Sequence, residues 1–110
     1  MSNYVFIESR DPFESPDTSF LAETAAALLK RRGNDVTVFL VQNGVLATRK
    51  QARKSHVPQL LESGVTVMAD DFSLRERGIQ FDECQANVRI APIDQLVDLV
   101  VQENTKAIWH

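Results

Sequence analysis

Cysteine is almost absent from this sequence: Cys84 is the only one among 110 residues. A single thiol cannot form an intramolecular disulfide, so the simplest location for the chain is the reducing cytoplasm. Histidine is nearly as scarce. His56 and His110 lie far apart and have no zinc-ligand spacing with Cys84, so we expect neither a metal site nor a cofactor.

The chain lacks the sequence features that several functional classes require. No apolar run approaches the roughly 20 residues that span a bilayer, and the first residues lack the charged and apolar segments of a secretory signal. The net charge is −3, whereas nucleic-acid-binding proteins are usually basic. No glycine-rich phosphate loop follows the first predicted strand. We therefore expect no membrane, nucleic-acid or nucleotide partner.

The residues that are present are typical of one α/β domain covering residues 1–110. With 44% hydrophobic residues the chain can form a core without disulfides or metals. Short apolar runs rich in β-branched residues predict strands near residues 3–8, 36–41, 65–69, 87–90 and 106–109. Strands that are apolar on both faces favour a parallel sheet covered on both sides. The predicted fold is therefore three-layered and flavodoxin-like, with a mostly parallel sheet of about five strands.

Helices are predicted between these strands from apolar periodicity and from glycine and proline signals. They are expected from Pro16 to Gly33, near Leu46–Ala52, at Val57–Glu62, at Phe72–Arg77 and from Pro92 onward. The two middle segments are separated because Pro58 lacks the amide that a continuous helix would need. In the last helix the apolar residues share one face; they are Ile93, Leu96, Val97, Val100 and Val101.

An acidic pair, Asp70 and Asp71, stands where the third predicted strand meets a short helix. The carboxyl ends of strands are common ligand-binding positions in α/β proteins. Two carboxylates there could hold a cation or share a proton if other ligands or an apolar pocket were near. The structural alternative is that Asp71 caps the helix and Asp70 is solvated. The sequence leaves both interpretations open.

Cys84 is the one candidate nucleophile or sulfur carrier. Its reactive form is the thiolate, which nearby positive charge favours. Its neighbours Asp82 and Glu83 are acidic and oppose ionisation, and the cations that could offset them are Arg75, Arg77 and Arg89. The alternative is an inert thiol in a loop or in the core.

Two further groups of residues could mediate contacts with other proteins. Arg49, Lys50, Arg53 and Lys54 form a local basic patch that could dock an acidic partner or could be a solvated helix face. The aromatic residues Phe13, Phe72, Phe81 and Trp109 fall in or beside predicted loops and at the end of the sequence. They predict self-association, unless the rings close the core locally.

The order of these segments resembles the DsrE/DsrF/DsrH-like sulfur-relay family, which includes the Tus proteins of tRNA thiolation. Four segments carry the resemblance over most of the chain. They are the first strand and alanine-rich helix (Tyr4–Gly33), the strand and glycine turn Val36–Val45, the strand and Arg-Gly helix within Gly64–Ile79, and the tail Ile93–Trp109. The tail is most similar to the DsrH/TusB branch.

The resemblance implies assembly into trimers, hexamers or mixed complexes. It also implies a relay cysteine at the end of the third strand, where this chain has Met68-Ala-Asp-Asp71. Two functions follow as hypotheses. One is a non-catalytic assembly or partner-binding subunit in intracellular sulfur trafficking. The other is a sulfurtransferase-like persulfide carrier that uses Cys84.

Overall fold

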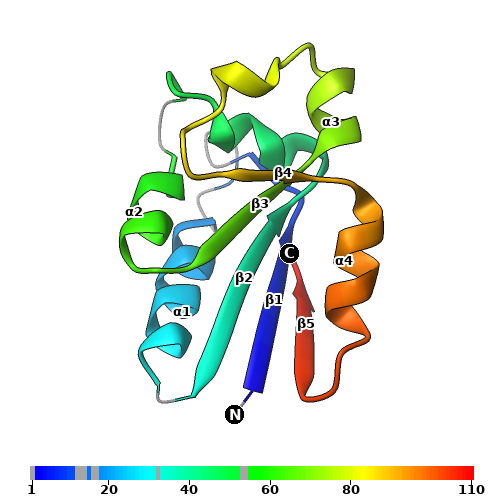
Figure 1. Cartoon of the computed structure of the whole chain (residues 1–110). Helices are drawn as coiled ribbons and strands as arrows, with labels where there is room; N and C mark the ends of the chain where they lie inside the picture. Colours follow the sequence, from blue (N-terminus) through cyan, green and yellow to red (C-terminus); the bar gives the residue numbers. More distant parts are fainter. Residues whose placement is uncertain (1, 12–14, 16–17, 32, 53–54) are drawn as a thin grey trace.

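The computed structural model describes residues 2–11, 15, 18–31, 33–52 and 55–110. Strands and helices alternate along the chain (Figure 1). The strands are β1 (Ser2–Glu8), β2 (Asn34–Leu40), β3 (Thr66–Asp70), β4 (Arg89–Ala91) and β5 (Thr105–Trp109). The α-helices are α1 (Thr18–Lys30), α2 (Val57–Glu62), α3 (Asp71–Glu76) and α4 (Ile93–Val100), and two 3-10 helices are η1 (Gln42–Thr48) and η2 (Phe81–Glu83).

The five described strands form one sheet in the order β4-β3-β2-β1-β5. Every neighbouring pair is parallel, with Tyr4 of β1 facing Val36 of β2 on one side and Lys106 of β5 on the other. The predicted parallel α/β fold is thereby confirmed. From β1 the chain builds the sheet outward through β2, β3 and β4, and β5 then returns to the far side of β1. The strand order therefore reverses between β1 and β5.

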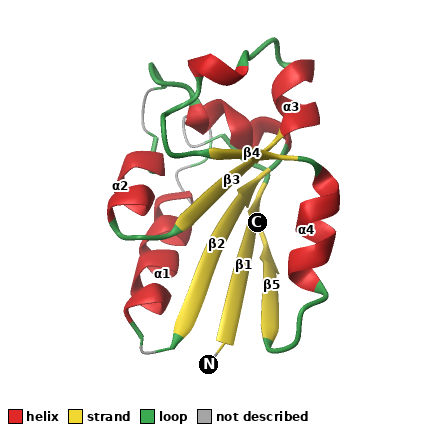
Figure 2. Cartoon of the chain, in the orientation of Figure 1, coloured by secondary structure: helices red, strands yellow, loops and turns green. Residues whose placement is uncertain are grey.

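Helices cover both faces of this sheet (Figure 2). Successive strand residues point to opposite faces, so Phe6 joins the cluster under α1 and α2 whereas Val5 and Ile7 join a second cluster. The second cluster includes Leu96 of α4. Both faces are buried over the three inner strands β1, β2 and β3, which is why these strands are largely apolar, whereas most of the outer strand β5 is exposed.

One predicted helix is only partly correct. The helix expected near Leu46–Ala52 is a 3-10 helix that starts earlier, at Gln42, and ends at Thr48, and Arg49 then forms an antiparallel bridge with Cys84. The Gln85 amide donates to the Thr48 carbonyl at 2.8 Å. These bonds to a distant segment replace the bonds that would have continued the helix.

The apolar face predicted for α4 is wider than the sheet can cover. Leu96 is buried, whereas Ile93, Val97 and Val101 are largely exposed. Helical spacing places these three on one stripe, which we call the α4 stripe. None of the helices in the described parts of the chain is long and apolar enough to cross a membrane.

Candidate functional site

The carboxyl ends of β1, β2 and β3 lie beneath a cap formed by η1, α3 and η2 (Figure 1). The approach between cap and sheet is close. A Cβ added to Gly44 of η1 would lie 2.3 Å from the Glu8 carbonyl oxygen at the end of β1. Only glycine fits without a shift of the backbone. The cap contains most of the residues that the sequence singled out.

Asp70 ends β3 and caps α3. Its Oδ2 accepts hydrogen bonds from the Ser73 amide at 3.1 Å and from the Ser73 hydroxyl at 2.6 Å. Only 6% of the residue is exposed. The interpretation that Asp71 caps the helix while Asp70 is solvated is therefore wrong, because the helix begins at Asp71 and its N-cap is the preceding residue.

Ser73 connects this cap to the neighbouring strand. Its hydroxyl oxygen also accepts from the Gln42 amide at 2.9 Å, at the point where the chain leaves β2 with a left-handed φ of 50°. Oδ1 of Asp70 is buried and has no hydrogen-bond partner among the described residues. The carboxylate therefore holds local structure, and among the described residues no cluster of three acidic, histidine or cysteine side chains could hold a metal ion.

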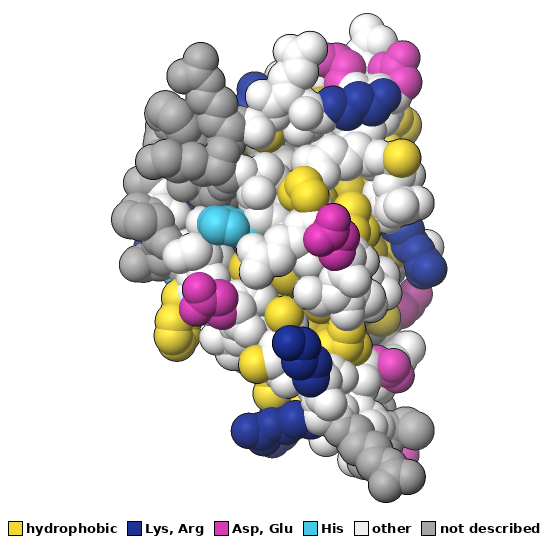
Figure 3. Space-filling model, turned by 90° about the vertical axis from the view of Figure 1, so that its left-hand side faces the viewer, with side chains coloured by type: hydrophobic (Ala, Val, Ile, Leu, Met, Phe, Trp, Pro, Cys, Tyr) yellow, Lys and Arg dark blue, Asp and Glu magenta, His cyan; other side chains and the backbone are white. Residues whose placement is uncertain are grey.

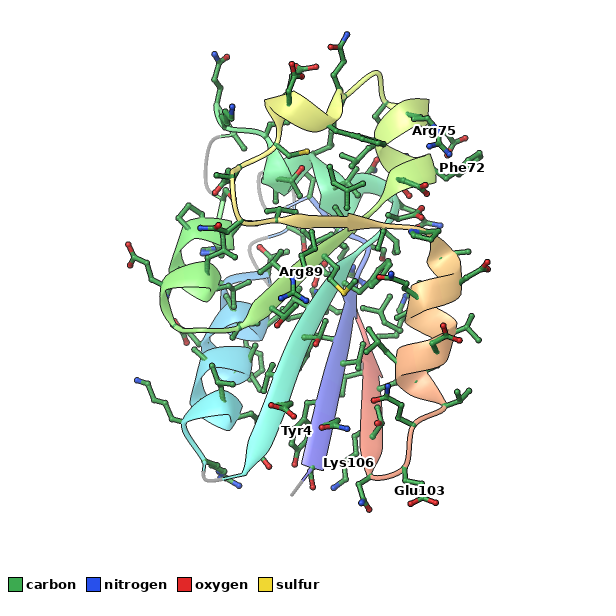
Figure 4. All side chains as sticks on the ribbon, in the orientation of Figure 1. Tyr4, Phe72, Arg75, Arg89, Glu103 and Lys106 are labelled. Atoms are coloured by element: carbon green, nitrogen blue, oxygen red, sulfur yellow. The ribbon has the colours of Figure 1, made fainter. Side chains whose placement is uncertain are left out.

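The arginines in and directly after α3 bond to side chains of the cap. Arg75 pairs with Asp71 across one helical turn at 3.4 Å, and Arg77 donates to the Asn43 side-chain oxygen at 3.1 Å. Figure 4 shows Arg75 and Phe72 on the outer side of α3 and Arg89 on β4, well apart from them. None of the contacts described for Arg75 and Arg77 is with Cys84.

Cys84 follows η2 and is buried, with 5% of its surface exposed. Its sulfur lies 3.4 Å from the hydroxyl oxygen of Thr48, which is itself fully buried. That hydroxyl donates its hydrogen to the Val45 carbonyl at 2.7 Å, so the remaining hydrogen in the contact is that of the thiol. The structure thus buries the thiol of Cys84 against Thr48 at the end of η1.

The basic patch is only partly described, since Arg53 and Lys54 lie outside the described residues. Arg49 and Lys50 line a hollow of about 470 Å³ together with Asp82 and Glu83. They follow η1 and do not form a helix face. Positive and negative side chains are also interspersed over the face seen in Figure 3. Acidic neighbours thus offset the basic charge of this hollow.

A hydrogen-bonded pair that the sequence did not reveal, Glu8 and His110, lies at the ends of β1 and β5. Nδ1 of His110 is 2.6 Å from Oε2 of Glu8, and the Arg10 amide donates to Oε1 at 2.9 Å. Burial raises the pKa of Glu8 above its usual 4.5, although these hydrogen bonds act in the opposite direction. This position is the topological switch point, where α/β sheets commonly bind ligands. An acidic residue ending an apolar strand was the available signal, but its partner depends on the strand order.

Comparisons with known proteins agree with this architecture. Residues 2–106 match the DsrE/DsrF-like family. Among solved structures, the fold is similar to YchN from E. coli, with a TM-score of 0.87 and 18% identity over the full length of both chains. It is also similar to MTH1491 from Methanobacterium thermoautotrophicum, with a TM-score of 0.79 and 21% identity over both full chains. BT1422 from Bacteroides thetaiotaomicron has a TM-score of 0.74 and 14% identity, over 99% of this chain and 95% of that one. A search of curated proteins found no match.

Proposed function

The chain belongs to the DsrE/DsrF-like family, and we propose that it acts in intracellular sulfur trafficking as a non-catalytic subunit that assembles with sulfur-handling proteins. One observation carries this proposal: the only thiol is closed off from solvent, with 5% exposure and a hydrogen bond to a fully buried threonine. A persulfide carrier must present its sulfur to a donor and then to an acceptor, and Cys84 presents it to neither.

The end of β3 supports the same proposal. This is where the resemblance places a relay cysteine. The stretch Met68–Asp71 stands there and contains no thiol, and its Asp70 is buried and bonded to Ser73. A carboxylate cannot accept a sulfane sulfur, because persulfide formation needs a thiolate nucleophile. The position instead fixes the start of α3. The stretch therefore offers a helix cap and no thiol for a sulfur relay.

The exposed apolar residues support an assembly role. The α4 stripe lies on the outer side of its helix, and Val97 at its centre is 53% exposed. Phe72, Phe81 and Trp109 are also largely exposed, whereas Phe13 lies outside the described residues. Contiguous exposed apolar surface typically marks a protein interface. We propose that the stripe forms the contact of a homo-oligomer, a trimer or hexamer as the resemblance implies, in preference to the hollow at Arg49 and Lys50.

The test is sulfur loading in the native and unfolded protein. The protein is incubated with an excess of a sulfane-sulfur donor such as polysulfide, with and without denaturant, and its intact mass is measured. We expect no gain in the native protein and a gain of one sulfur atom after unfolding, which Cys84→Ser abolishes. A gain of one sulfur in the native protein that depends on Cys84 would replace this proposal with the persulfide-carrier function.

A further inference from the structure

The outer edge of β5 is open. β5 ends the sheet on one side (Figure 2), and its only strand partner in the described parts of the chain is β1. The backbone of His110 faces β1, since its amide donates to the Ile7 carbonyl at 2.8 Å. Backbone groups alternate in direction along a strand of a ladder. The amides and carbonyls of Thr105, Ala107 and Trp109 therefore point away from β1.

No described residue covers these outward groups. Ala107 and Trp109 are exposed, and β5 has neither a proline nor a bulge, two features that commonly block edge strands. Its charged residue, Lys106, does not block the edge either, because its Nζ lies back over the Tyr4 ring of β1, 5.9 Å from the ring centroid (Figure 4). Another extended strand would satisfy such a row of donors and acceptors. The edge therefore selects a strand as its occupant.

The three outward residues are symmetric about Ala107. In an antiparallel pair, opposite residues can exchange both of their N–H···O bonds. When β5 of a second copy runs antiparallel along this edge, Ala107 lies opposite Ala107 of the second copy, and Thr105 lies opposite Trp109 of the second copy. All three outward residues are then paired, with about six hydrogen bonds in total. A shift of two residues in register would leave some of these groups unpaired.

The side chains fit this register. The methyl group of Ala107 is small enough to meet its own copy at the two-fold axis. Lys106 lies opposite Ile108 of the second copy, so no like charges face each other directly. The aliphatic stem of the lysine can cover that isoleucine, which is 38% exposed in the single chain. Trp109, which is 64% exposed, lies over Thr105 of the second copy.

We propose that β5 pairs antiparallel with β5 of a second copy of this chain, joining the two sheets into one across a two-fold axis. The symmetry about Ala107 selects a second copy over an unrelated peptide strand. The contact uses different residues from the α4 stripe. It can therefore fail while the assembly proposed above stands, and the two contacts can be tested separately.

Cross-linking at Ala107 tests the pairing and its register. In a Cys84→Ser background, Ala107→Cys places two thiols at the axis with Cα atoms about 5.5 Å apart, within the range of a disulfide. Diamide removes two hydrogens from the thiol pair, and the resulting disulfide doubles the mass of the denatured protein. Lys106→Cys is the matched control, because its two copies would lie on a diagonal about 7–8 Å apart. We expect Ala107→Cys to cross-link about tenfold faster than this control.

A second variant removes an outward donor. Ala107→Pro deletes an amide that does not face β1, at a type of position where edge strands tolerate proline. Circular dichroism should stay unchanged, and light scattering should show half the native mass. Ala107→Ser keeps the amide and a small side chain and should keep that mass.

Two results would overturn the proposal. One is absent cross-linking at Ala107→Cys, or equal cross-linking of Ala107→Cys and Lys106→Cys. The other is a folded Ala107→Pro protein that keeps the native mass. Either result, combined with a lower mass in Val97→Lys, would leave the α4 stripe as the contact between copies.

Discussion

The cap over the carboxyl ends of the strands and the β5–α4 side of the molecule are built in opposite ways. In the cap, most of the polar groups bond to one another: Oδ2 of Asp70 to Ser73, Ser73 to the Gln42 amide, and Cys84 to Thr48. On the β5–α4 side, apolar groups such as Val97 and Trp109 stay uncovered. The carboxyl ends of the strands, where α/β folds commonly bind ligands, are covered by the cap. Apolar side chains of the β5–α4 side, which would ordinarily be buried, are exposed to solvent. This contrast is consistent with the proposed assembly role.

Replacing Asp70 should produce the largest effect, because the cap depends on it. Asp70→Ala removes two hydrogen bonds and leaves the buried Ser73 donors without their partner. We expect a loss of about 2 kcal/mol in the free energy of unfolding. The measurement is equilibrium denaturation by urea. Asp71→Ala is the matched control and should cost about 0.5 kcal/mol or less, since it removes a partly exposed ion pair. Equal losses in both variants would contradict the account of the cap.

On the opposite side, a charge in the α4 stripe should change assembly and leave the fold intact. Val97→Lys is expected to alter stability by less than about 0.5 kcal/mol, because the side chain is already exposed. Multi-angle light scattering should show the mass falling from an oligomer towards the 12.4 kDa of one chain. Gln102→Lys adds the same charge to a neighbouring exposed polar residue and should keep the oligomer. A native protein that is already 12.4 kDa at every concentration would rule out the assembly.

The strands of the sheet and the cap differ in how well the sequence predicts them. The strands are predicted almost correctly, because a buried parallel strand needs a continuous run of largely apolar residues that can be recognised locally, as in Val36–Leu40. The helix expected near Leu46–Ala52 starts and stops earlier than predicted, and it ends at Thr48 because Cys84 and Gln85, distant in sequence, bond to this segment. The residue pattern within Leu46–Ala52 cannot show that a distant segment will bond to it.

The candidate site shows the same limit. Asp70 and Asp71 are correctly located at a strand end, but a shift of one residue in the helix start reverses their roles. Glu8 and His110 are 102 residues apart and meet only because β5 pairs with β1. The burial of Cys84 likewise depends on η1 folding back over η2. In each case the sequence indicates the residue, and the tertiary fold decides what it contacts.

The smallest effect that we predict is a pH dependence from the Glu8–His110 pair. Burial raises the pKa of Glu8 above 4.5, so the folded state binds this proton more tightly than the unfolded state does. The resulting stabilisation is complete below pH 4.5 and is lost as the pH rises through the folded pKa. Glu8→Gln should therefore flatten the pH dependence of unfolding from pH 4.5 upward. Glu103→Gln, at an exposed position, should leave the profile unchanged; an identical profile in Glu8→Gln would contradict the prediction.

The most direct test of the central claim, that the only thiol is closed, is the rate at which it can be labelled. The reaction of Cys84 with 5,5′-dithiobis(2-nitrobenzoate) is followed at increasing urea concentration, beside the loss of circular dichroism. We predict very slow labelling in the native protein and a rate that increases in parallel with unfolding, because the Thr48–Cys84 contact must open first. Labelling of the native protein at the rate of a free cysteine peptide, unchanged by urea, would contradict the account and restore Cys84 as a candidate sulfur carrier.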